Sequence, residues 1–547
     1  MAQAGFVEQI YQGRFDRELF QTTLPATESD PVARLIDAYR ALVTTYPPVS
    51  IEEAGRIPPE MLKKMGEQGF FGLTVPEAYG GQGLGLSECM RIVETVAPID
   101  LSVALVFLAH LFIGIKGIEL YGTEDQKRRY LTLAASGSMI FSYALTEPLT
   151  GSDARHIETR AELSADGSHY ILNGTKTYIT NANYAGGLTV FAQLDPQKPG
   201  HMGAFIVETA WEGVQIGPDM PKMGLKASST ATIRLKDVRV PRENLLGPAG
   251  AGFKIALTVL HYGRMGLGAA SRGVMAQSVQ DMRERAASRR QFGQPIIQFP
   301  LIREKIGKAA VHAFVMGAMN DFAAALLEKN PEETVIETSH CKLFGTTWAW
   351  DALYDALQVC GGAGYLATQP YEKRMRDFRV TTIFEGTTEI HSIYPALLGM
   401  KQIGGEIKKR HGLDRLLFLG GTLLTGLWNA GWPESPKDPV QKRAFREAKL
   451  LARMIRRRIL LGVLVYGKSL VNREFFLRRI TILSLYLFGI LSVLAKLARD
   501  RHPGVDNPLD RDCLAWFLEE AATARKDHGQ FRDSRMEKAL MGPYLVS

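Results

Sequence analysis

The chain has 547 residues, a length that at about 100–200 residues per domain predicts three or four folding units. Hydrophobic residues make up 46% and charged residues 22%, values that exclude a disordered, collagen-like or disulfide-stapled protein. The 65 Lys and Arg residues outnumber the 57 Asp and Glu residues and give a net charge of +8. That excess alone leaves nucleic acid, anionic lipid and an anionic cofactor open as partners.

Two further features of composition bear on location. The cysteines have no metal or redox spacing, which predicts buried thiols in a reducing compartment and no metal site; they are Cys89, Cys341, Cys360 and Cys513. Residues 1–20 mix acidic and basic side chains and lack an apolar core, so neither a secretory signal nor a transit peptide is expected. No uncharged apolar run reaches about 18 residues, so no membrane span is expected either.

Residues 1–140 are predicted to form an N-terminal helical domain. Met61, Met65 and Phe70 follow a rough helical spacing. The long apolar stretch Leu101 to Tyr121, which ends at Gly122, predicts a buried helix.

The hydrophobic period changes in residues 141–245, which are predicted to form a central β domain. His169 to Leu172 and Thr175 to Thr180 are predicted to form a hairpin with Asn173-Gly174 at its tight turn. Further strands are expected at residues 188–192, 204–208 and 230–240.

Helical spacing returns at residue 252, and residues 246–405 are predicted to form a helical bundle, followed by an appended helical domain at residues 406–547. The helices expected in the bundle lie at residues 252–288, 300–328, 332–360 and 386–402. Helices, then strands, then helices predict a mostly helical α+β class with segregated elements. No strand precedes a G-x-G-x-x-G motif, so a Rossmann dinucleotide site is not expected.

Seven short motifs then occur in one order along the chain. They are Tyr143–Asp153, Thr177–Asn181, Met223–Leu225, Gly252–Lys254, Arg289–Gly293, Gln358–Tyr365 and Ile383–Ile390. Together they resemble the acyl-CoA dehydrogenase family from about residue 30 to residue 405. The resemblance implies a helical, a β and a second helical domain. It also implies bound FAD and the oxidation of fatty acyl-CoA to trans-2-enoyl-CoA in β-oxidation, with electrons passed to an electron-transferring flavoprotein.

The resemblance places the catalytic base at Glu385. A carboxylate that takes the weakly acidic α-proton of a thioester needs a dry pocket, because removal from water makes it a stronger base. Some family members carry the base on an earlier helix, just before an arginine; here that position is Gly263, before Arg264. A glycine cannot act as a base, which favours Glu385. The substrate contacts implied are Ser152, His261, Arg264 and Gly386.

The resemblance also implies the FAD contacts. Those around the flavin ring and the phosphates are Tyr143, Leu145, Thr146, Ser152, Tyr178 and Thr180. A second group is expected to reach the FAD of a neighbouring subunit or its pyrophosphate and adenine, which implies a homodimer; it comprises Arg289, Gln291, Phe292, Gln358, Gly361, Gly362, Thr387, Thr388 and Glu389.

The length of the chain favours the very-long-chain type, which has a further C-terminal domain. Leu105, Phe107 and Leu108 are expected near the floor of the acyl cavity, where their bulk argues for a shorter chain. An acyl-CoA oxidase that uses oxygen and a non-catalytic, membrane-bound assembly protein remain the alternatives.

The charge excess is local. Residues 441–480 hold twelve Lys and Arg residues and two acidic ones, a net +10 against +8 for the whole chain. Leu450, Leu451, Met454, Ile455, Ile459 and Leu460 supply an apolar side. Together with the apolar run Ile480 to Ala495, this predicts either contact with an anionic membrane surface through residues 441–495 or ordinary packing in a bundle.

No nucleic-acid recognition motif accompanies these basic residues, so nucleic acid is not expected as a partner. A cytoplasmic location, with peripheral attachment to the inner face of a bacterial membrane, is favoured over the mitochondrial matrix.

Overall fold

The computed structural model describes residues 4–22, 29–425, 432–499 and 508–540. It is 64% helix and 13% strand, so the mostly helical α+β class is confirmed. Contacts divide the chain into two compact units. We call them the sheet unit (Ala26–Ile296 and Ala349–Glu385) and the helical unit (Met1–Pro25, Ile297–Trp348 and Gly386–Ser547). Residues 1–25 thus group with the C-terminal region by contacts, and the four domain boundaries drawn from the sequence stay predictions.

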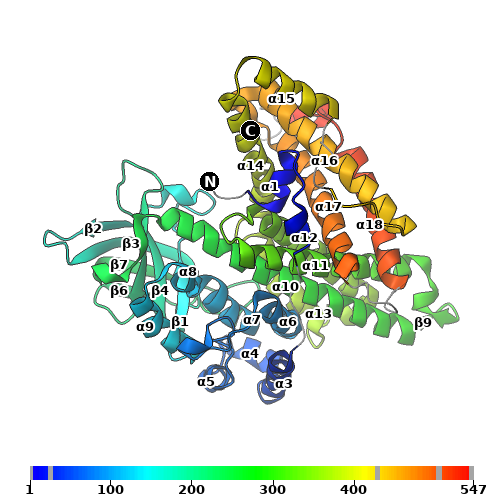
Figure 1. Ribbon diagram of the computed structural model, residues 1–547. Helices are drawn as coiled ribbons and strands as arrows, with labels where there is room; N and C mark the ends of the chain where they lie inside the picture. The colour runs from blue at the N-terminus through cyan, green and yellow to red at the C-terminus, as the bar shows by residue number, and fades with distance from the viewer. Residues whose placement is uncertain (1–3, 23–28, 426–431, 500–507, 541–547) are drawn as a thin grey trace. The chain divides into compact units, whose positions relative to one another are not determined.

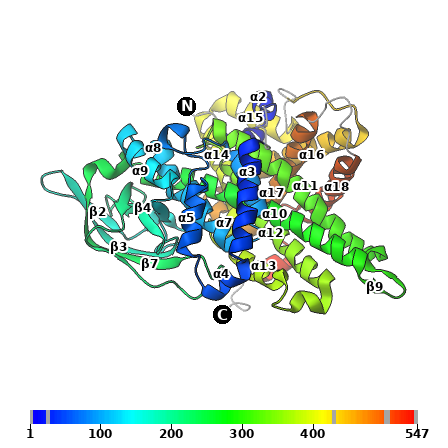
Figure 2. The same ribbon diagram turned by 90° about the horizontal axis from the view of Figure 1, so that it is seen from below.

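The sheet unit combines the main sheet with helices (Figure 1). Its helices are α3 (Asp30–Thr45), α4 (Pro48–Ala54), α5 (Pro59–Glu67), α6 (Leu86–Val96), α7 (Leu101–Leu108), α8 (Lys116–Tyr121), α9 (Glu124–Ala135), α10 (Gly252–Ser288) and α13 (Pro370–Phe378). Helix α6 packs against α3, α7 and α10, in the part of the unit seen from below in Figure 2. The long helix α10 matches the segment predicted from the sequence.

Within the described residues, eight strands form the main sheet, in the order β6-β7-β3-β2-β4-β5-β8, and β1 pairs with β4. They are β1 (Ile140–Ala144), β2 (Arg160–Leu163), β3 (His169–Thr180), β4 (Ala185–Gln193), β5 (Met202–Glu208), β6 (Val214–Ile216), β7 (Thr230–Pro241) and β8 (Leu245–Gly250). A short pair, β9 (Arg290–Gln291) and β10 (Gln294–Pro295), lies outside it. Leu172, Leu188, Val190 and Phe205 are among the fully buried side chains of its core.

The predicted hairpin at Asn173-Gly174 is wrong. Strand β3 runs unbroken through both residues and pairs with β7, and a register shift separates Leu172 from Gly174. The Asn173 side chain exchanges hydrogen bonds with Asp237 on β7, at 3.0 and 2.8 Å. A Cβ at Gly174 would lie 2.3 Å from Thr159 Oγ1, so this glycine permits a close approach at a bulge instead of a turn.

The apolar stretch Leu101 to Tyr121 is helical, as expected, but a π-turn (η2, Ala109–Gly114) separates α7 from α8. Ile115 N donates to His110 O at 2.9 Å, an i to i−5 bond. His110 is fully buried, and its Nδ1 accepts from Phe141 N at 2.9 Å. Its Nε2 therefore carries the proton and donates to Phe71 O at 3.1 Å. Burial lowers the pKa of His110 to about 4. The ring thus ties the π-turn to β1.

The helical unit contains the C-terminal elements. Its helices are α1 (Phe6–Tyr11), α2 (Arg17–Phe20), α11 (Pro300–Lys329), α14 (Thr388–Lys409), α15 (Gly412–Thr425), α16 (Pro439–Tyr466), α17 (Glu474–Arg499), α18 (Pro508–Asp527) and α19 (Arg535–Leu540). Helix α12 (Val335–Cys360) runs through the boundary at Trp348. The apolar stretch that begins at Leu416 lies in α15 as far as Thr425, and its last residue, Trp428, lies outside the described residues.

The basic stretch 441–480 belongs mainly to α16, and most of its expected apolar side faces inward, although Leu450 is 38% exposed. Leu451, Ile455 and Ile459 are fully buried, and α16 packs against α17. Ile480 to Ala495 is a buried helix, the expected alternative to interfacial insertion. Arg479 is buried as well, and its guanidinium pairs with Asp533 and Glu537 at 2.7 and 2.8 Å. Part of the local charge is therefore neutralised within the unit.

Within the described residues, three segments are long and apolar enough to cross a membrane, although uncharged runs alone had predicted no span. They are Leu101–Tyr121, Pro300–Lys329 and Glu474–Ala498. The structure buries 94%, 83% and 83% of their most apolar windows, respectively. Packing within the protein accounts for their composition.

Candidate active site

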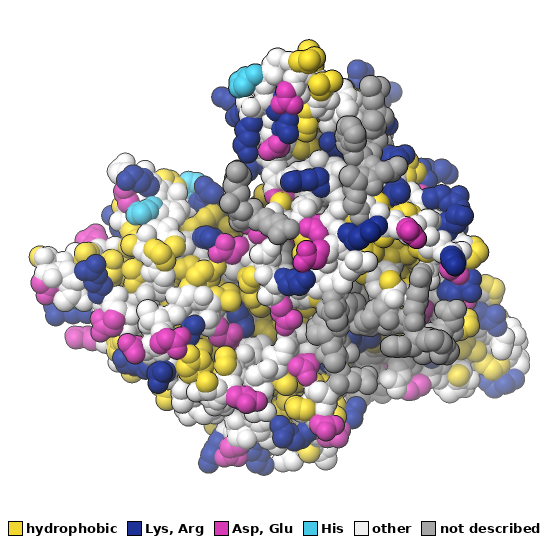
Figure 3. Space-filling model, viewed as in Figure 1, with side chains coloured by type: hydrophobic (Ala, Val, Ile, Leu, Met, Phe, Trp, Pro, Cys, Tyr) yellow, Lys and Arg dark blue, Asp and Glu magenta, His cyan; other side chains and the backbone are white. Residues whose placement is uncertain are grey.

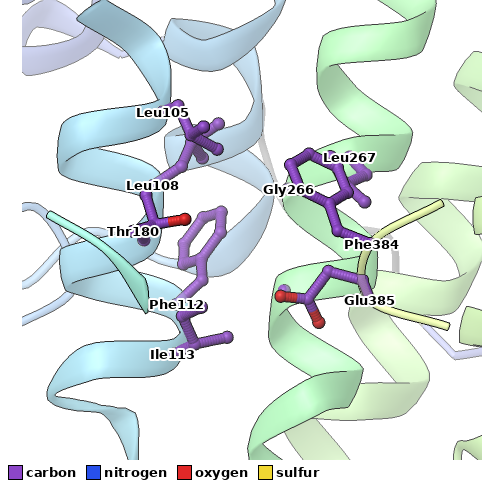
Figure 4. A pocket seen from close by; sticks show the side chains of 11 residues that line it. Leu105, Leu108, Phe112, Ile113, Thr180, Gly266, Leu267, Phe384 and Glu385 are labelled. Carbon is purple, nitrogen blue, oxygen red and sulfur yellow. The ribbon is translucent and has the colours of Figure 1, made fainter. Parts of the chain in front are cut away.

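A small apolar pocket of the sheet unit contains one carboxylate (Figure 4). Its walls come from α7 and the π-turn, from the end of β3, from α10 and from the loop before α14. The lining residues are Leu105, Leu108, Ala109, Phe112, Ile113, Thr180, Gly263, Gly266, Leu267, Phe384 and Glu385. Their side chains leave a cavity of only about 40 Å³. Phe107, expected near the floor, does not line the pocket and packs against Phe70.

The Glu385 carboxylate lies where α10 has no side chain. A Cβ built on Gly263 would stand 2.9 Å from Glu385 Oε2 and 2.9 Å from Ile113 Cγ2. Because Gly263 has no side chain, it leaves the space that the Glu385 carboxylate occupies. Glu385 also has φ +57, a backbone conformation that costs a non-glycine residue on the order of 1–3 kcal/mol and often marks a functional site.

Two further polar side chains lie next to Gly263 on α10. Arg264 and His261 are both buried, with Arg264 Nη1 3.2 Å from His261 Nδ1. Burial, and then the Arg264 charge, lower the pKa of His261 well below its usual value, so the ring is neutral and accepts from the guanidinium. Burial and the Glu385 carboxylate raise the pKa of Tyr143, whose hydroxyl donates to Ala256 O at 3.1 Å. The charges of Glu385 and Arg264 therefore both act on Tyr143.

The end of β3 presents an aromatic side chain on a strained backbone. Tyr178 has φ +57 and is 67% exposed, and Asn181 has φ +66. Thr177 N donates to Thr146 O at 2.9 Å, so the segment after β1 lies beside this strand end. Asn181 Nδ2 donates to Val106 O at 2.8 Å and connects the same strand end to α7. An exposed ring, two threonines and the carboxylate pocket therefore share one region of the sheet unit.

A buried ion pair beneath this region was not predicted from the sequence. Lys176 Nζ lies 2.7 Å from Glu147 Oε1 and donates to Leu145 O at 3.2 Å. Glu147 also accepts from Thr159 N at 3.0 Å. Burial lowers the pKa of Lys176 to about 8, an effect that Glu147 partly offsets. The sequence signal that could have revealed this pair is a lysine at a position of the alternating strand where the side chain points into the core.

The remaining predicted contacts do not line the Glu385 pocket. Those in the sheet unit are exposed: Arg289, Gln291, Phe292, Gln358, Gly361 and Gly362. Phe292 is 93% exposed. Ser152 is exposed as well. A Cβ at Gly361 or Gly362 would meet nothing within 4 Å. These positions therefore form outer surface of the described chain.

Gly386 and the residues that follow it belong to the helical unit by contacts. Gly386 has φ +94, and a Cβ there would lie 2.7 Å from His391 Nε2, so no other residue fits easily. Lys342 Nζ donates to Gly386 O at 2.6 Å. Thr387 caps α14 through its hydroxyl, which accepts from Ile390 N at 3.4 Å, and Thr388 and Glu389 form the first turn.

No metal site accompanies this pocket in the residues that the structure describes. Among them, no group of three or more His, Cys, Asp or Glu side chains is arranged to hold an ion.

Comparisons with known proteins agree with these features. Three family models match in chain order: the acyl-CoA dehydrogenase N-terminal domain (residues 34–138), middle domain (142–238) and C-terminal domain (250–394). The mitochondrial very long-chain specific acyl-CoA dehydrogenase of Bos taurus is 34% identical over 520 residues, which cover 89% of this chain and 77% of that protein.

Solved structures show the same likeness. An acyl-CoA dehydrogenase from Bacillus anthracis complexed with FAD has a TM-score of 0.82 and 29% identity, and the match covers 99% of this chain and 94% of that one. Butyryl-CoA dehydrogenase from Megasphaera elsdenii has a TM-score of 0.64 and 29% identity, covering 69% of this chain and 99% of that one. On these matches, the chain belongs to the acyl-CoA dehydrogenase family.

Proposed function

We propose that the protein is an FAD-dependent dehydrogenase that converts fatty acyl-CoA into trans-2-enoyl-CoA, with Glu385 as the base. The observation that carries this proposal is the Glu385 carboxylate in an apolar pocket, in the space left by Gly263. An apolar pocket keeps water from the carboxylate and strengthens it as a base. The α-carbon of the thioester would face Glu385 Oε2, and the acyl chain would follow the apolar walls.

The residues present fit the cofactor. A flavin ring needs an apolar or aromatic platform with a few hydrogen-bonding groups, and exposed Tyr178 with Thr146 and Thr180 offers one. Leu145, Tyr143 and Ser152 complete this set, and the Lys176–Glu147 pair holds its backbone. Bound FAD supplies the acceptor for the β-hydrogen that leaves with its electron pair.

The chain's own groups orient the reaction. Glu385 takes the proton, and Gly386 lets the thioester approach the backbone closely because it has no side chain. Lys342 fixes this peptide by donating to Gly386 O. Arg264 is buried beside Gly263 and adds a positive charge to this part of α10.

Chain length and electron acceptor are finer proposals. We infer that the substrates are long-chain acyl-CoAs, because the very-long-chain relative matches over more residues than the three family models span. An electron-transferring flavoprotein is the proposed acceptor in β-oxidation. Peroxide formed at the rate of turnover would instead favour an oxidase.

We also propose a homodimer. Phe292 and Tyr365 are 93% and 81% exposed, an unusual state for large apolar rings. Both lie in motifs whose family counterparts meet a neighbouring subunit or its cofactor. A second copy of this chain would cover them.

We propose that the protein is cytoplasmic and attaches peripherally to a membrane. We further propose that α15 makes the membrane contact, since the apolar side of α16 is largely buried. Leu413, Leu416 and Leu417 of α15 are 71%, 67% and 65% exposed. Hydrophobic and basic side chains lie side by side at the surface over α15 (Figure 3). An exposed apolar helix face flanked by basic residues suits an anionic lipid surface.

The test of the catalytic proposal is Glu385→Gln. The variant keeps the size of the side chain and removes the base, so we expect it to bind FAD but to lose bleaching of the flavin when acyl-CoA is added without oxygen. Glu53→Gln, at an exposed position of α4, is the matched control and should bleach like the parent protein. Normal bleaching by Glu385→Gln would refute the assignment.

A further inference from the structure

Three buried side chains of the helical unit surround Gly386, the residue that follows the proposed base. Lys342 and Ser339 lie about one turn apart on α12, and His391 lies in the first turn of α14. Lys342 and Ser339 are 0% exposed and His391 is 1% exposed. None of these three side chains lines the pocket at Glu385. We therefore expect any effect that they have on the reaction to pass through the backbone of Gly386.

The backbone at this place does not hold its conformation unaided. Glu385 has φ +57 and Gly386 has φ +94, so two consecutive residues lie in the left-handed region. A glutamate is disfavoured there, and such a conformation persists only where the surrounding contacts impose it. Glycine enters this region readily but leaves it as readily. The direction of the Glu385 side chain, which projects into the apolar pocket (Figure 4), therefore depends on the contacts made with this loop.

The first of these contacts is made with the carbonyl group of Gly386. Lys342 Nζ donates to Gly386 O at 2.6 Å. An ammonium group makes a stronger hydrogen bond to a carbonyl oxygen than a neutral donor does. Rotation about the Cα–C bond of Gly386 would swing this oxygen away and break the bond. Lys342 thus restrains the ψ angle of Gly386.

The second contact is made beside the α-carbon of Gly386. A Cβ at this position would lie 2.7 Å from His391 Nε2, so the imidazole lies where a side chain would begin. The other ring nitrogen, Nδ1, lies 2.7 Å from Ser339 Oγ. Because a hydrogen bond at one ring nitrogen determines the role of the other, Ser339 directs Nε2 toward the loop. Since Ser339 and Lys342 are three residues apart, one face of α12 controls both contacts.

We propose that His391 and Lys342 are positioning residues of the catalytic loop and that Ser339 orients His391 for this role. Together they hold Gly386 in its left-handed conformation and so fix the place of the Glu385 carboxylate. This inference rests on the proposed function. A catalytic group must stay within about 0.5 Å of its productive place, and a displacement of about 1 Å can cost about 100-fold in rate. Loss of either contact should therefore slow proton transfer more than it weakens substrate binding.

The test changes each contact separately. His391→Asn keeps an amide near the place of Nδ1, and hence the contact with Ser339, but withdraws Nε2 from Gly386. His391→Gln is the rescue variant, because its longer side chain restores a nitrogen near the place of Nε2. Lys342→Met removes the charged donor with little change in volume. Ser339→Ala is the mild variant, because it removes one hydroxyl and leaves the imidazole free to turn.

His340→Asn is the matched control. His340 is also a fully buried histidine beside a serine, but its Nε2 lies 2.9 Å from Ser484 Oγ on α17 and not at the catalytic loop. This control therefore measures the effect of a similar defect in the core of the same unit. We expect it to keep the parent rate of proton transfer.

Two measurements are made on each protein. The first is the rate of flavin bleaching after anaerobic mixing with acyl-CoA at a series of concentrations. The second is amide hydrogen exchange of residues 383–391 with and without FAD, which needs no turnover. We expect His391→Asn and Lys342→Met to lower the limiting bleaching rate by about 10- to 100-fold and to speed exchange in this segment. The half-saturating concentration of acyl-CoA should change by less than about threefold. His391→Gln should recover most of the parent rate.

Parent bleaching rates in both His391→Asn and Lys342→Met overturn the proposal, and so does the parent rate in Ser339→Ala. An equal loss of rate in His340→Asn overturns it too, because a general defect of the helical core would then explain the result. Failure of the parent protein to oxidise any acyl-CoA would refute the proposed function itself. Hydrogen exchange would still decide whether these side chains hold the loop, so the two failures are distinguishable.

Discussion

The contact between Gly263 and Glu385 makes a sharp prediction for Gly263→Ala. Ordinary van der Waals contacts begin at 3.4 Å, whereas the new Cβ would stand 2.9 Å from Glu385 Oε2 and 3.0 Å from Glu385 Cδ. The carboxylate must therefore shift by at least about 0.5 Å, close to the tolerance of a catalytic group.

A displacement of about 1 Å can cost about 100-fold in rate. We therefore expect the proton-transfer rate to fall between about 10- and 100-fold, or about 1.4–2.7 kcal/mol of transition-state stabilisation. Overpacking should also lower the free energy of unfolding by about 1–3 kcal/mol. FAD binding should persist, because the atoms nearest to a Cβ at Gly263 belong to Glu385 and Ile113 and not to the residues proposed to hold the flavin.

The assay is anaerobic rapid mixing with acyl-CoA, in which flavin bleaching reports the reaction, repeated with α-deuterated substrate. Gly266→Ala is the matched control, because its Cβ would lie 2.6 Å from Phe112 Cδ2 and crowds the same pocket without contacting the base. We expect that variant to change KM and to keep the parent isotope effect. Parent rates and isotope effect in Gly263→Ala would refute the inference that the glycine makes room for the base.

Three other variants test different parts of the molecule. Lys176→Met leaves Glu147 buried without its partner, so chemical denaturation should show a loss of about 3–5 kcal/mol and weaker FAD binding; parent stability would contradict the structural role of the pair. Burial raises the pKa of Glu337 to about 7 from 4.5. A carboxyl with a raised folded pKa gives stability that is present below the unfolded value and is lost as pH rises through about 7. Glu337→Gln should therefore raise the free energy of unfolding at pH ~8 by about 2–3 kcal/mol and change little at pH ~4; equal effects at both pH values would contradict burial as the cause. Leu416→Asp combined with Leu417→Asp should abolish co-sedimentation with phosphatidylglycerol vesicles and leave acyl-CoA oxidation intact, and unchanged co-sedimentation would refute α15 as the membrane contact.

The sequence predicted best where the hydrophobic period was long and uninterrupted. Helix α10 was expected at residues 252–288 and occupies Gly252–Ser288. Asn173-Gly174 failed because the dipeptide is common both to tight turns and to bulges. The choice here depends on Asp237 and Thr159, which are remote in sequence.

The same limit applies to the site. Motif order identified Glu385, but the sequence does not reveal that its carboxylate fills the space beside Gly263. The apolar side of α16 had the composition of a membrane helix and of a buried helix alike. Only the packing of α17 against it distinguishes the two. Lys176 was overlooked because a buried lysine is recognisable only once its partner Glu147 is in place.

The π-turn at Ala109–Gly114 affects how this pocket can change by mutation. Its extra residue rotates everything beyond it by about 100° relative to an unbroken α-helix. Gly114 O, which accepts from Thr189 Oγ1 at 2.8 Å, lies at the end of the turn, and Leu108 lies before it. Deleting one residue here would restore a regular helix. The rotation would then displace either the side chains of the pocket wall or the residue that contacts β4. Substitutions can therefore resize the pocket gradually, whereas insertions or deletions in this segment would change its shape in a single step.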